Sequence, residues 1–506
     1  MVTAADPAGE QNPLRVGLSA GGATVPCAFV IFGVTGDLSQ RKLLPALYNL
    51  AVRGLLPAHL AIVGHGRRAL SDDEFQSFAR EAVERFSRTS VDAGVWAAFA
   101  KLLHYSRGGF DQAGLTELGS VLEQVDRDRR TARNRVFYLS TPSSFFPQIV
   151  SGMRETGLNR PGGFVRVVIE KPFGHDLASS RELAAEVHRA FDEPEIYRID
   201  HYLGKETVQN IFAFRFANTI FEPVWNNTHV DHVQLTVAES IGVEHRAAFY
   251  EETGVVRDIV QNHLLQVLAL VAMEPPAFFS ADPVRDEKTK LLSAMRPMEL
   301  RHAVRGQYGA GFVAGSHAPG YAEEEDVPAG TTTATFMAAR LLIDNWRWAG
   351  TPFYIRTGKR LAKRVTEVAV QFKQPPHLPF PVEAVEHLEP DSLVLRIQPD
   401  EGISLRFGAK APSPTLMLRS VNMDFLYGSS FLADVPEAYE TLILDSIRGD
   451  GTLFTRQDGV ERAWEIVDPL IESWRKGAPQ LYTAGSWGPE QADQLLATDG
   501  RRWRRP

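Results

Sequence analysis

The stretch Cys27-Ala-Phe-Val-Ile-Phe32-Gly33-Val-Thr-Gly36-Asp37-Leu38 decides the fold. Its first six residues form a continuous apolar run, which predicts a fully buried β-strand. Residues 41–50 then have helical spacing, and a second short apolar strand follows at 60–63. Strand, glycine turn, helix and strand form a βαβ unit. Such a unit predicts a parallel sheet with right-handed crossovers.

The glycine turn suits the pyrophosphate of a dinucleotide. Glycine lets the backbone approach the phosphates, and a helix N-terminus supplies N–H groups and positive dipole. Compared with the G-x-G-x-x-G pattern, Ile31 stands in the first glycine position, while Gly33 and Gly36 hold the second and third. The motif alone leaves open a tight strand–helix turn that binds nothing.

The end of the second strand indicates which dinucleotide is bound. An NAD site usually has an acid there, which bonds the ribose 2′-hydroxyl. This chain has Gly64-His-Gly-Arg67-Arg68 instead, with no acid in place. Guanidinium groups suit a 2′-phosphate, so the sequence favours NADP, with Arg67 as the ligand. Surface arginines on a loop are the alternative.

The remaining pattern divides the chain. Further apolar strands at 136–139 and 165–169 and helical patterns at 72–86 and 116–125 extend the first unit. After residue 200 the strands lengthen and several alternate in polarity, which is typical of antiparallel strands with one covered face. These strands are expected at 230–237, 331–343, 367–372, 393–398 and 402–407, with helices at 255–272 and 436–447.

We therefore predict three parts. Residues 1–26 form a flexible tail, residues 27–200 form a Rossmann-type α/β dinucleotide-binding domain, and residues 201–506 form a larger α+β domain with a mostly antiparallel sheet. The larger domain is expected to bind substrate. The run Arg501-Arg-Trp-Arg-Arg505 is expected to be a solvated tail.

Composition excludes several classes of protein. The 506 residues carry 54 Lys+Arg and 62 Asp+Glu, a net charge of −8, which argues against general nucleic-acid binding. A phosphorylated ligand would need a local basic cluster. The single cysteine, Cys27, excludes an intrachain disulfide and any metal site built on two thiolates, and it fits a reducing cytoplasm. The longest apolar run, 264–273, falls short of the ~18 residues of a membrane span.

Two motifs mark a ligand site at the domain junction. Glu170-Lys171-Pro172-Phe-Gly174 follows a buried strand, and Ile199-Asp200-His201-Tyr202-Leu-Gly-Lys205 lies at the boundary. Carboxyl ends of parallel strands and domain interfaces commonly bind ligands. His201, Tyr202 and Lys205 together could hold a phosphate dianion, and Lys171 could reach both a cofactor and a substrate.

A third motif lies on a buried helix. Arg257-Asp258-Ile-Val-Gln-Asn262-His263-Leu-Leu-Gln266 is followed by apolar residues up to Ala272. Polar residues on such a helix must be hydrogen-bonded or functional. For His263 alone, a core histidine with satisfied hydrogen bonds is the alternative.

Five motifs in order resemble the glucose-6-phosphate dehydrogenase family, over about residues 28–474. They are Gly33-Val-Thr-Gly-Asp-Leu38, Glu170-Lys-Pro-Phe-Gly174, Arg198-Ile-Asp-His-Tyr-Leu-Gly-Lys205, the run from Arg257 to Gln266, and Arg356-Thr-Gly-Lys359. The resemblance implies oxidation of glucose 6-phosphate to 6-phosphoglucono-1,5-lactone, the first oxidative step of the pentose phosphate pathway. The hydride goes to NADP, so no metal or covalent nucleophile is required.

The resemblance also implies roles for residues. His263 is the general base that removes the proton of the C1 hydroxyl, and Asp200 orients it. His201, Tyr202 and Lys205 match the 6-phosphate ligands. The other sugar-contacting positions are Lys171, Glu239, Asp258, Lys359, Arg364 and Gln398. The cofactor positions are Gly33, Thr35, Gly36, Asp37, Leu38, Arg67 and Lys171. Pro172 matches a proline that the family can hold in cis.

The resemblance further implies association with a second copy of the chain, as a dimer or tetramer, with no nucleic-acid or membrane partner. Two other functions stay open. A glucose–fructose-oxidoreductase type of sugar dehydrogenase also carries a Glu-Lys-Pro motif, but its substrate need not be phosphorylated, and the His201 and Lys205 cluster argues against it. A sensor without catalysis is the second alternative, and the His263 and Asp200 pair argues against it.

Overall fold

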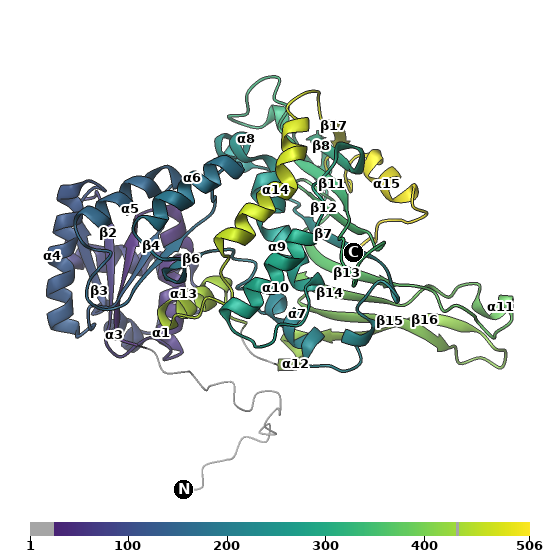
Figure 1. Ribbon diagram of the computed structural model, residues 1–506, viewed down its shortest axis with the longest axis horizontal. Coiled ribbons are helices and arrows are strands. Elements are labelled where there is room, and N and C mark those ends of the chain that lie inside the picture. Colours follow the sequence, from purple (N-terminus) through teal and green to yellow (C-terminus); the bar gives the residue numbers. More distant parts are fainter. Residues whose placement is uncertain (1–24, 432–434) are drawn as a thin grey trace, which may run out of the picture.

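The computed structural model describes residues 25–431 and 435–506, so that most of the expected tail at 1–26 lies outside the described residues (Figure 1). The first half of the chain forms a six-stranded parallel sheet in the order β3-β2-β1-β4-β5-β6. This order is that of a doubly wound dinucleotide fold, which confirms the predicted fold class for this half. The strands are β1 (Cys27–Phe32), β2 (Leu60–Gly66), β3 (Leu103–Arg107), β4 (Arg135–Leu139), β5 (Val165–Ile169) and β6 (Ile196–Arg198).

Helices fill the connections between these strands (Figure 1). They are α1 (Leu44–Val52), α2 (Asp72–Phe86), α3 (Ala93–Ala100), α4 (Gln112–Arg129), α5 (Phe146–Glu155) and α6 (Leu177–His188). The prediction for α2 has the observed bounds. The helix after the glycine turn differs from a plain α-helix, because it opens with a π-helical segment, η2 (Ser39–Leu43). Strand β3 was not predicted, since its sequence LHYSR has too few apolar residues to stand out.

The second half forms a nine-stranded sheet in the order β16-β15-β14-β13-β7-β12-β11-β8-β17. Only the β7–β12 and β8–β17 pairs are parallel, so the prediction of a mostly antiparallel sheet is confirmed. The strands are β7 (Val230–Ala238), β8 (Ala303–Gly309), β11 (Phe336–Leu341), β12 (Phe353–Gly358), β13 (Val365–Phe372), β14 (Ser392–Gln398), β15 (Gly402–Lys410), β16 (Leu418–Leu426) and β17 (Gln480–Thr483). A small separate pair is formed by β9 (Gly311–Val313) and β10 (Ser316–Ala318).

One predicted strand was too long. Residues 331–343 were expected to be extended throughout, but β11 covers only Phe336–Leu341. The hydroxyls of Thr331 and Thr333 both donate to the carboxylate of Glu251 instead of lying in the sheet. Hydrogen bonds to a carboxylate far away in the sequence therefore hold these two threonines outside the strand.

Helices cover the large sheet on the side that faces the first domain (Figure 1). They are α7 (Glu206–Phe216), α8 (Ala247–Val255), η7 (Val256–Leu264), α9 (Leu265–Ala272), α10 (Ala281–Ala294) and α14 (Gln457–Ser473), with α11 (Val382–Val385), α12 (Tyr427–Phe431), α13 (Ala438–Arg448) and α15 (Glu490–Ala497) elsewhere. The expected helix at 255–272 is present as η7, which is π-helical, followed by α9.

The helical stretch over 247–272, which is kinked at Gly254, corrects one expectation. By length and composition it could cross a membrane, although the sequence reading found no such segment. In its most apolar window, 94% of the residues are buried inside the protein. A core helix of a folded protein passes the same test, because it is apolar on every face.

Buried side-chain donors fix the end of α9. The indole N–H groups of Trp225 and Trp348 donate to the carbonyls of Val271 and Ala272, each at 2.7 Å. The guanidinium of Arg215 donates to the carbonyl of Leu270 at 2.9 Å. The last carbonyls of a helix have no partner within the helix, so these buried donors satisfy them. The helix that carries His263 is therefore anchored at its far end.

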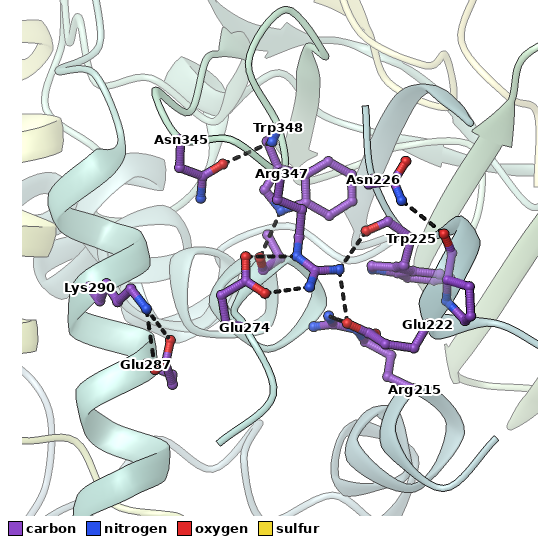
Figure 2. Close-up of polar contacts among 12 residues, drawn as sticks. Arg215, Glu222, Trp225, Asn226, Glu274, Glu287, Lys290, Asn345, Arg347 and Trp348 are labelled. Atoms are coloured by element: carbon purple, nitrogen blue, oxygen red, sulfur yellow. Dashed lines mark hydrogen bonds and ion pairs between the residues drawn. The ribbon is translucent and has the colours of Figure 1, made fainter. Parts of the chain in front are cut away.

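An ion cluster holds these donors in position (Figure 2). Arg347 pairs with Glu222 at 2.8 Å and forms two hydrogen bonds with Glu274. Glu222 also accepts from Arg215 at 3.1 Å. Buried guanidinium groups need such partners, because an unpaired charge is costly to bury.

The chain returns to the first domain late in its course. Helix α13 packs against α1 (Figure 1), and the buried carboxylate of Glu440 accepts from Asn49 at 3.1 Å and from Arg88 at 2.7 Å.

The expectation of a solvated tail at 501–505 is wrong. Trp503 is buried, Arg501 pairs with Asp231 at 2.9 Å, and Arg504 pairs with Glu367 at 2.9 Å. The buried aromatic ring and the acids Asp231 and Glu367 hold this end of the chain on the sheet.

Candidate active site

The carboxyl edge of the parallel sheet gathers residues from several motifs. Gly33 follows β1, Arg67 follows β2, Lys171 comes two residues after β5, and Asp200 comes two residues after β6. Because all six strands run in the same direction, these residues share one edge, the usual ligand edge of such sheets. The Lys171–Pro172 peptide bond is cis, as the sequence reading anticipated.

One end of the large sheet gathers the second group. The parallel strands β7 and β12 end side by side at Ala238 and Gly358, and Glu239 and Lys359 follow them. Lys359 Nζ donates to Glu239 Oε2 at 2.6 Å. Arg364 precedes β13, and Gln398 ends β14 opposite Thr366. Four predicted sugar-contacting residues therefore meet at one edge.

His263 and Asp200 form the centre of the site. His263 Nδ1 lies 2.5 Å from Asp200 Oδ1, and both side chains are 1% exposed. The N–H of Tyr202 donates to the same Asp200 oxygen at 2.9 Å. A carboxylate partner keeps the proton of a neutral imidazole on Nδ1, which leaves Nε2 as the atom with a free lone pair.

Lys171 connects this pair to the next motif. Its Nζ lies 3.0 Å from His263 Nε2 and donates to Asp258 Oδ1 at 2.9 Å. An ammonium has only donors, so His263 Nε2 is the acceptor in that contact. The contacts of His263 with Asp200 and with Lys171 therefore indicate the same protonation state, with the proton on Nδ1 and the lone pair on Nε2.

The electrostatics of the pair favour a neutral base. Burial lowers the pKa of His263, Lys171 lowers it further, and Asp200 and Asp258 only partly offset these effects. Burial alone would raise the pKa of Asp200, but His263, His201 and the Tyr202 N–H outweigh it and lower that pKa to about 2. At neutral pH an ionised carboxylate therefore supports an uncharged imidazole.

The predicted phosphate ligands lie beside the pair. The Tyr202 ring stacks on His263, with centroids 4.5 Å apart, and Lys205 Nζ lies 4.4 Å from the centre of the Tyr202 ring. Burial, followed by the like charge of Arg364, lowers the pKa of Lys205 to about 8. Burial and the neighbouring His263 and Lys171 lower the pKa of His201 well below its usual range. The cations of Lys205 and Arg364, together with the neutral imidazole of His201, form a good site for a dianion.

Lys205 is also held by an amide. Its ammonium donates to Gln398 Oε1 at 2.5 Å, and the Gln398 amide donates to Thr366 Oγ1 at 3.0 Å. This contact joins the first domain's junction motif to the end of β14. It brings Gln398 next to the predicted phosphate ligands. Glu239 and Lys359 lie toward Asp258. Burial alone would raise the pKa of Asp258, but Lys171 and Lys359 outweigh this effect and lower that pKa to about 2.

The glycine turn fits a dinucleotide. Gly33 has a φ of +73°, and a Cβ there would lie 2.7 Å from the Ser140 carbonyl oxygen, so no side chain is tolerated. The Gly36 N–H donates to the Gly33 carbonyl at 2.8 Å, and the helix starts at Asp37. Thr35, Asp37 and Leu38 therefore lie at a helix N-terminus, where anions bind to backbone N–H groups.

Exposed guanidinium groups stand next to this turn. Arg67 and Arg68 directly follow β2, the neighbour of β1, and both are exposed. The Asp37 carboxylate pairs with Arg41 at 2.7 Å. The turn and the arginines fit a phosphorylated dinucleotide.

Several functional neighbours were missed from the sequence. Glu170 is fully buried and accepts from the hydroxyl of Tyr138 at 2.5 Å, and its pKa is raised by burial. The Tyr439 ring lies nearly parallel to His201, with centroids 6.4 Å apart. Tyr439 comes from α13, more than 200 residues along the chain from His201, and no local pattern marks it.

Asp200, His201 and His263 bring donor atoms within 4.8 Å of one another. Three such groups could hold a metal ion. However, the Lys171 ammonium contacts His263 Nε2, and His263 Nδ1 is bonded to Asp200. An ammonium in this position opposes a divalent cation, so the arrangement suits proton transfer better than metal binding.

Comparison with known sequences supports a family assignment. Residues 30–210 match the family model for the glucose-6-phosphate dehydrogenase NAD-binding domain, and residues 212–504 match the C-terminal domain of the same family. Glucose-6-phosphate 1-dehydrogenase 2 of Mycobacterium tuberculosis is 49% identical over 487 residues, 95% of each chain. The Chlamydia muridarum glucose-6-phosphate 1-dehydrogenase is 46% identical over 95% of this chain and 97% of its own.

Solved structures agree with these sequences. A structure described as glucose-6-phosphate dehydrogenase in complex with its substrate glucose-6-phosphate has a TM-score of 0.87 and 34% identity, covering 96% of this chain and all of its own. The glucose-6-phosphate 1-dehydrogenase of Mycobacterium avium has a TM-score of 0.80 and 37% identity, covering 95% of this chain and 99% of its own. Both halves of the chain, and their order, are thus accounted for, and the chain belongs to the glucose-6-phosphate dehydrogenase family.

Proposed function

We propose that this protein oxidises glucose 6-phosphate at C1 to 6-phosphoglucono-1,5-lactone and passes the hydride to NADP. The observation that carries the proposal is the buried Asp200–His263 pair, whose unprotonated Nε2 lies 3.0 Å from the Lys171 ammonium. Family membership supports the same reaction, because both the sequence relatives and the solved structures carry this activity in their names.

The proton transfer falls to His263. Its Nε2 accepts the proton of the C1 hydroxyl, and the resulting imidazolium is stabilised by the Asp200 carboxylate across the 2.5 Å hydrogen bond. The lowered pKa of His263 keeps the base uncharged at neutral pH. General-base catalysis of this kind contributes about 10²–10⁴-fold.

The phosphate anchors the substrate. His201, Tyr202 and Lys205 bind it, with Arg364 and Gln398 at its rim. The lowered pKa of Lys205 supports this role, because burial and the neighbouring Arg364 outweigh the acids Glu401 and Asp200. Binding energy from a remote group can orient the reacting carbon, so the phosphate contributes to rate as well as to affinity.

The remaining polar groups hold the sugar. Glu239, Asp258 and Lys359 form a charged rim whose members already pair with Lys171 or with one another. Lys171 links the rim to His263 and reaches toward the nicotinamide side. These groups have hydrogen-bonding capacity for hydroxyls, and their fixed positions favour one orientation of the ring.

NADP, when bound, supplies the hydride acceptor. The chain would hold its pyrophosphate at the turn from Gly33 to Leu38, through backbone N–H groups of Thr35, Asp37 and Leu38, with Gly36 leaving room for the close approach. Arg67 binds the 2′-phosphate through forked hydrogen bonds. The absence of an acid at the end of β2 favours NADP over NAD.

The organisation of the chain is part of the proposal. We place the boundary between the dinucleotide-binding domain, 27–200, and the substrate domain, 201–506, at the junction motif. We also propose that the protein works in the cytoplasm, associates with a second copy of itself through the larger domain, and has neither nucleic-acid nor membrane partners.

A spectrophotometric assay tests the proposed function. Glucose 6-phosphate with NADP should give a fast rise in the absorbance of reduced nicotinamide, and glucose 6-phosphate with NAD should give a slower rise. Glucose without the phosphate should give little. Equal turnover of glucose and glucose 6-phosphate would favour the glucose–fructose-oxidoreductase type, and ligand binding without nicotinamide reduction would favour a sensor.

A further inference from the structure

The C-terminal segment from β17 onward carries none of the five sequence motifs, yet it contacts one of the loops of the site. Strand β17 pairs with β8 at one edge of the large sheet (Figure 1). The loop that the segment reaches joins β12 to β13. This loop begins with Lys359 and includes Arg364, and both are predicted sugar-contacting residues. The C-terminal segment therefore lies against a loop with a functional residue at each end.

Hydrogen bonds join the segment to successive residues of the loop. The Tyr482 hydroxyl donates to the Lys359 carbonyl at 2.6 Å. Two backbone bonds continue the contact, from the Gly485 N–H to the Arg360 carbonyl at 2.7 Å and from the Ala362 N–H to the Ser486 carbonyl at 3.0 Å. Arg360 has a φ of +51°, in the left-handed region that costs energy for a residue with a side chain. The surrounding contacts must hold the loop in this conformation.

The contact of Tyr482 with Lys359 has a fixed direction. A carbonyl only accepts, so the single hydroxyl proton of Tyr482 goes to Lys359. The Thr335 hydroxyl, 3.2 Å from the Tyr482 oxygen, is then the donor to that oxygen, and it accepts from the Tyr308 N–H at 3.0 Å. The Lys359 N–H donates in turn to the Thr335 carbonyl at 3.0 Å. Both backbone polar groups of Lys359 are therefore held by one buried network.

The Lys359 side chain depends on this backbone position. Its ammonium donates to Glu239 Oε2 at 2.6 Å and lies 5.1 Å from the centre of the Tyr250 ring. A carboxylate and an aromatic face are both favourable neighbours for an ammonium, and the side chain is only 2% exposed. A shift of the Lys359 backbone would move the ammonium away from both neighbours, because a closely packed side chain moves with its backbone.

We propose that Tyr482 is a positioning residue for the sugar site. Its hydroxyl holds the backbone of Lys359, and thereby the ammonium that contacts the sugar in the proposed function, on which this inference rests. Tyr482 itself does not touch the substrate in this role. The C-terminal segment thus contributes to the geometry of the site as well as to the sheet, since a small misplacement of a substrate-binding group is enough to slow a reaction.

A double-mutant cycle in the full chain tests this role. Tyr482→Phe keeps the ring and removes the hydroxyl, so kcat/KM for glucose 6-phosphate should fall about 5–20-fold, while the KM for NADP should stay unchanged. In a Lys359→Met background the same change should alter kcat/KM by less than about 2-fold, because the group through which Tyr482 acts is gone. Calorimetric Kd values for glucose 6-phosphate give the same cycle if Lys359→Met turns over too slowly.

Tyr321→Phe is the matched control. Its hydroxyl donates to Glu251 at 2.5 Å, and its ring lies 6.2 Å from that of Tyr250, in the same group of buried tyrosines. This variant also loses a buried hydroxyl, but not one that holds Lys359. It should leave kcat/KM for glucose 6-phosphate unchanged in both backgrounds.

Two outcomes would overturn the inference. One is a folded Tyr482→Phe variant with the kcat/KM of the wild type. The other is an equal loss with and without the Lys359 ammonium, because a hydroxyl that only stabilises the fold acts independently of that group. If Tyr482→Phe does not fold, Thr335→Val, which removes the donor to the Tyr482 oxygen, should show the same coupling to Lys359→Met, and Thr335→Ser should match the wild type; additive losses for Thr335→Val would then decide against the inference. A wild type inactive on glucose 6-phosphate would instead refute the proposed function.

Discussion

Lys171 Nζ lies 3.0 Å from Nε2 of His263, the atom that the proposed mechanism uses as the base. The ammonium can donate only, so it holds the lone pair of His263 in a fixed direction without supplying a competing acceptor. The same ammonium is retained by Asp258. Lys171 thus orients the base and also lowers its pKa, two effects that favour proton removal near neutral pH.

Replacing the base should separate chemistry from binding. His263→Asn should lower kcat by several orders of magnitude with a modest change in the KM for glucose 6-phosphate, because the amide has no basic nitrogen at this position. Steady-state kinetics measure both constants, and NADP binding by fluorescence titration serves as the control for folding. A variant with nearly normal kcat would remove His263 from the mechanism.

Activity should depend on pH in a direction set by the buried pair. Burial lowers the pKa of His263 below the ordinary 6.5, so kcat/KM should remain high down to that lowered pKa and fall only as pH drops through it. Asp200→Asn removes an influence that raises the pKa of His263. Its acid limb should therefore move to lower pH while kcat falls by about 10²-fold or more. A limb that moves upward would contradict this account.

The phosphate contacts should show in KM. Lys205→Met should raise the KM for glucose 6-phosphate by about 100-fold, since a charge-assisted contact is lost, and the slow turnover of glucose should change little. Because the pKa of Lys205 is about 8 in the free protein, the wild-type KM should rise as pH passes above 8. Exposed Lys290→Met is the control, and an equal loss with glucose would argue against phosphate binding.

Cofactor choice should depend on Arg67. Arg67→Ala should raise the KM for NADP by about 10–100-fold and leave the KM for NAD nearly unchanged, because only NADP carries the 2′-phosphate. Arg80 is exposed on α2 and pairs with Glu84, so Arg80→Ala provides a matched surface control. If both cofactors weakened equally, the 2′-phosphate role would have to be given up.

The anchor at the end of α9 should contribute to stability. Trp348→Phe keeps most of the ring but removes the donor to the Ala272 carbonyl, so the buried oxygen loses its partner. We expect a loss of about 1–3 kcal/mol, seen as a lower Tm in differential scanning fluorimetry. Trp346 is almost fully exposed two residues away, and Trp346→Phe should leave the Tm unchanged. Equal melting of both variants would show that the indole N–H contributes nothing.

Local patterns were enough to predict much of the fold. The apolar run at Cys27–Phe32 and the glycines after it form a local pattern, and the βαβ unit that they begin predicts the parallel sheet that is observed. The junction motif likewise indicated His201 and Lys205, because both lie within one short segment. Residues that share one short segment can be identified without knowing the contacts between distant parts of the chain.

Contacts between distant segments could not be anticipated. Tyr439 lies beside His201 only because α13 returns to the first domain. The tail at 501–505 was predicted to be solvated because it is rich in arginine, but Trp503 and the acids Asp231 and Glu367 determine where it lies. In each case the partner that fixes the residue is more than 80 positions away along the chain.

The return of α13 has a practical consequence for work with fragments. A recombinant piece that stops at residue 200 would lack the helix that covers α1, and Asn49 and Arg88 would lose the carboxylate of Glu440. Such a piece should be poorly soluble when expressed alone. Adding a peptide that spans 436–450 in trans should rescue it, in the manner of split-protein complementation.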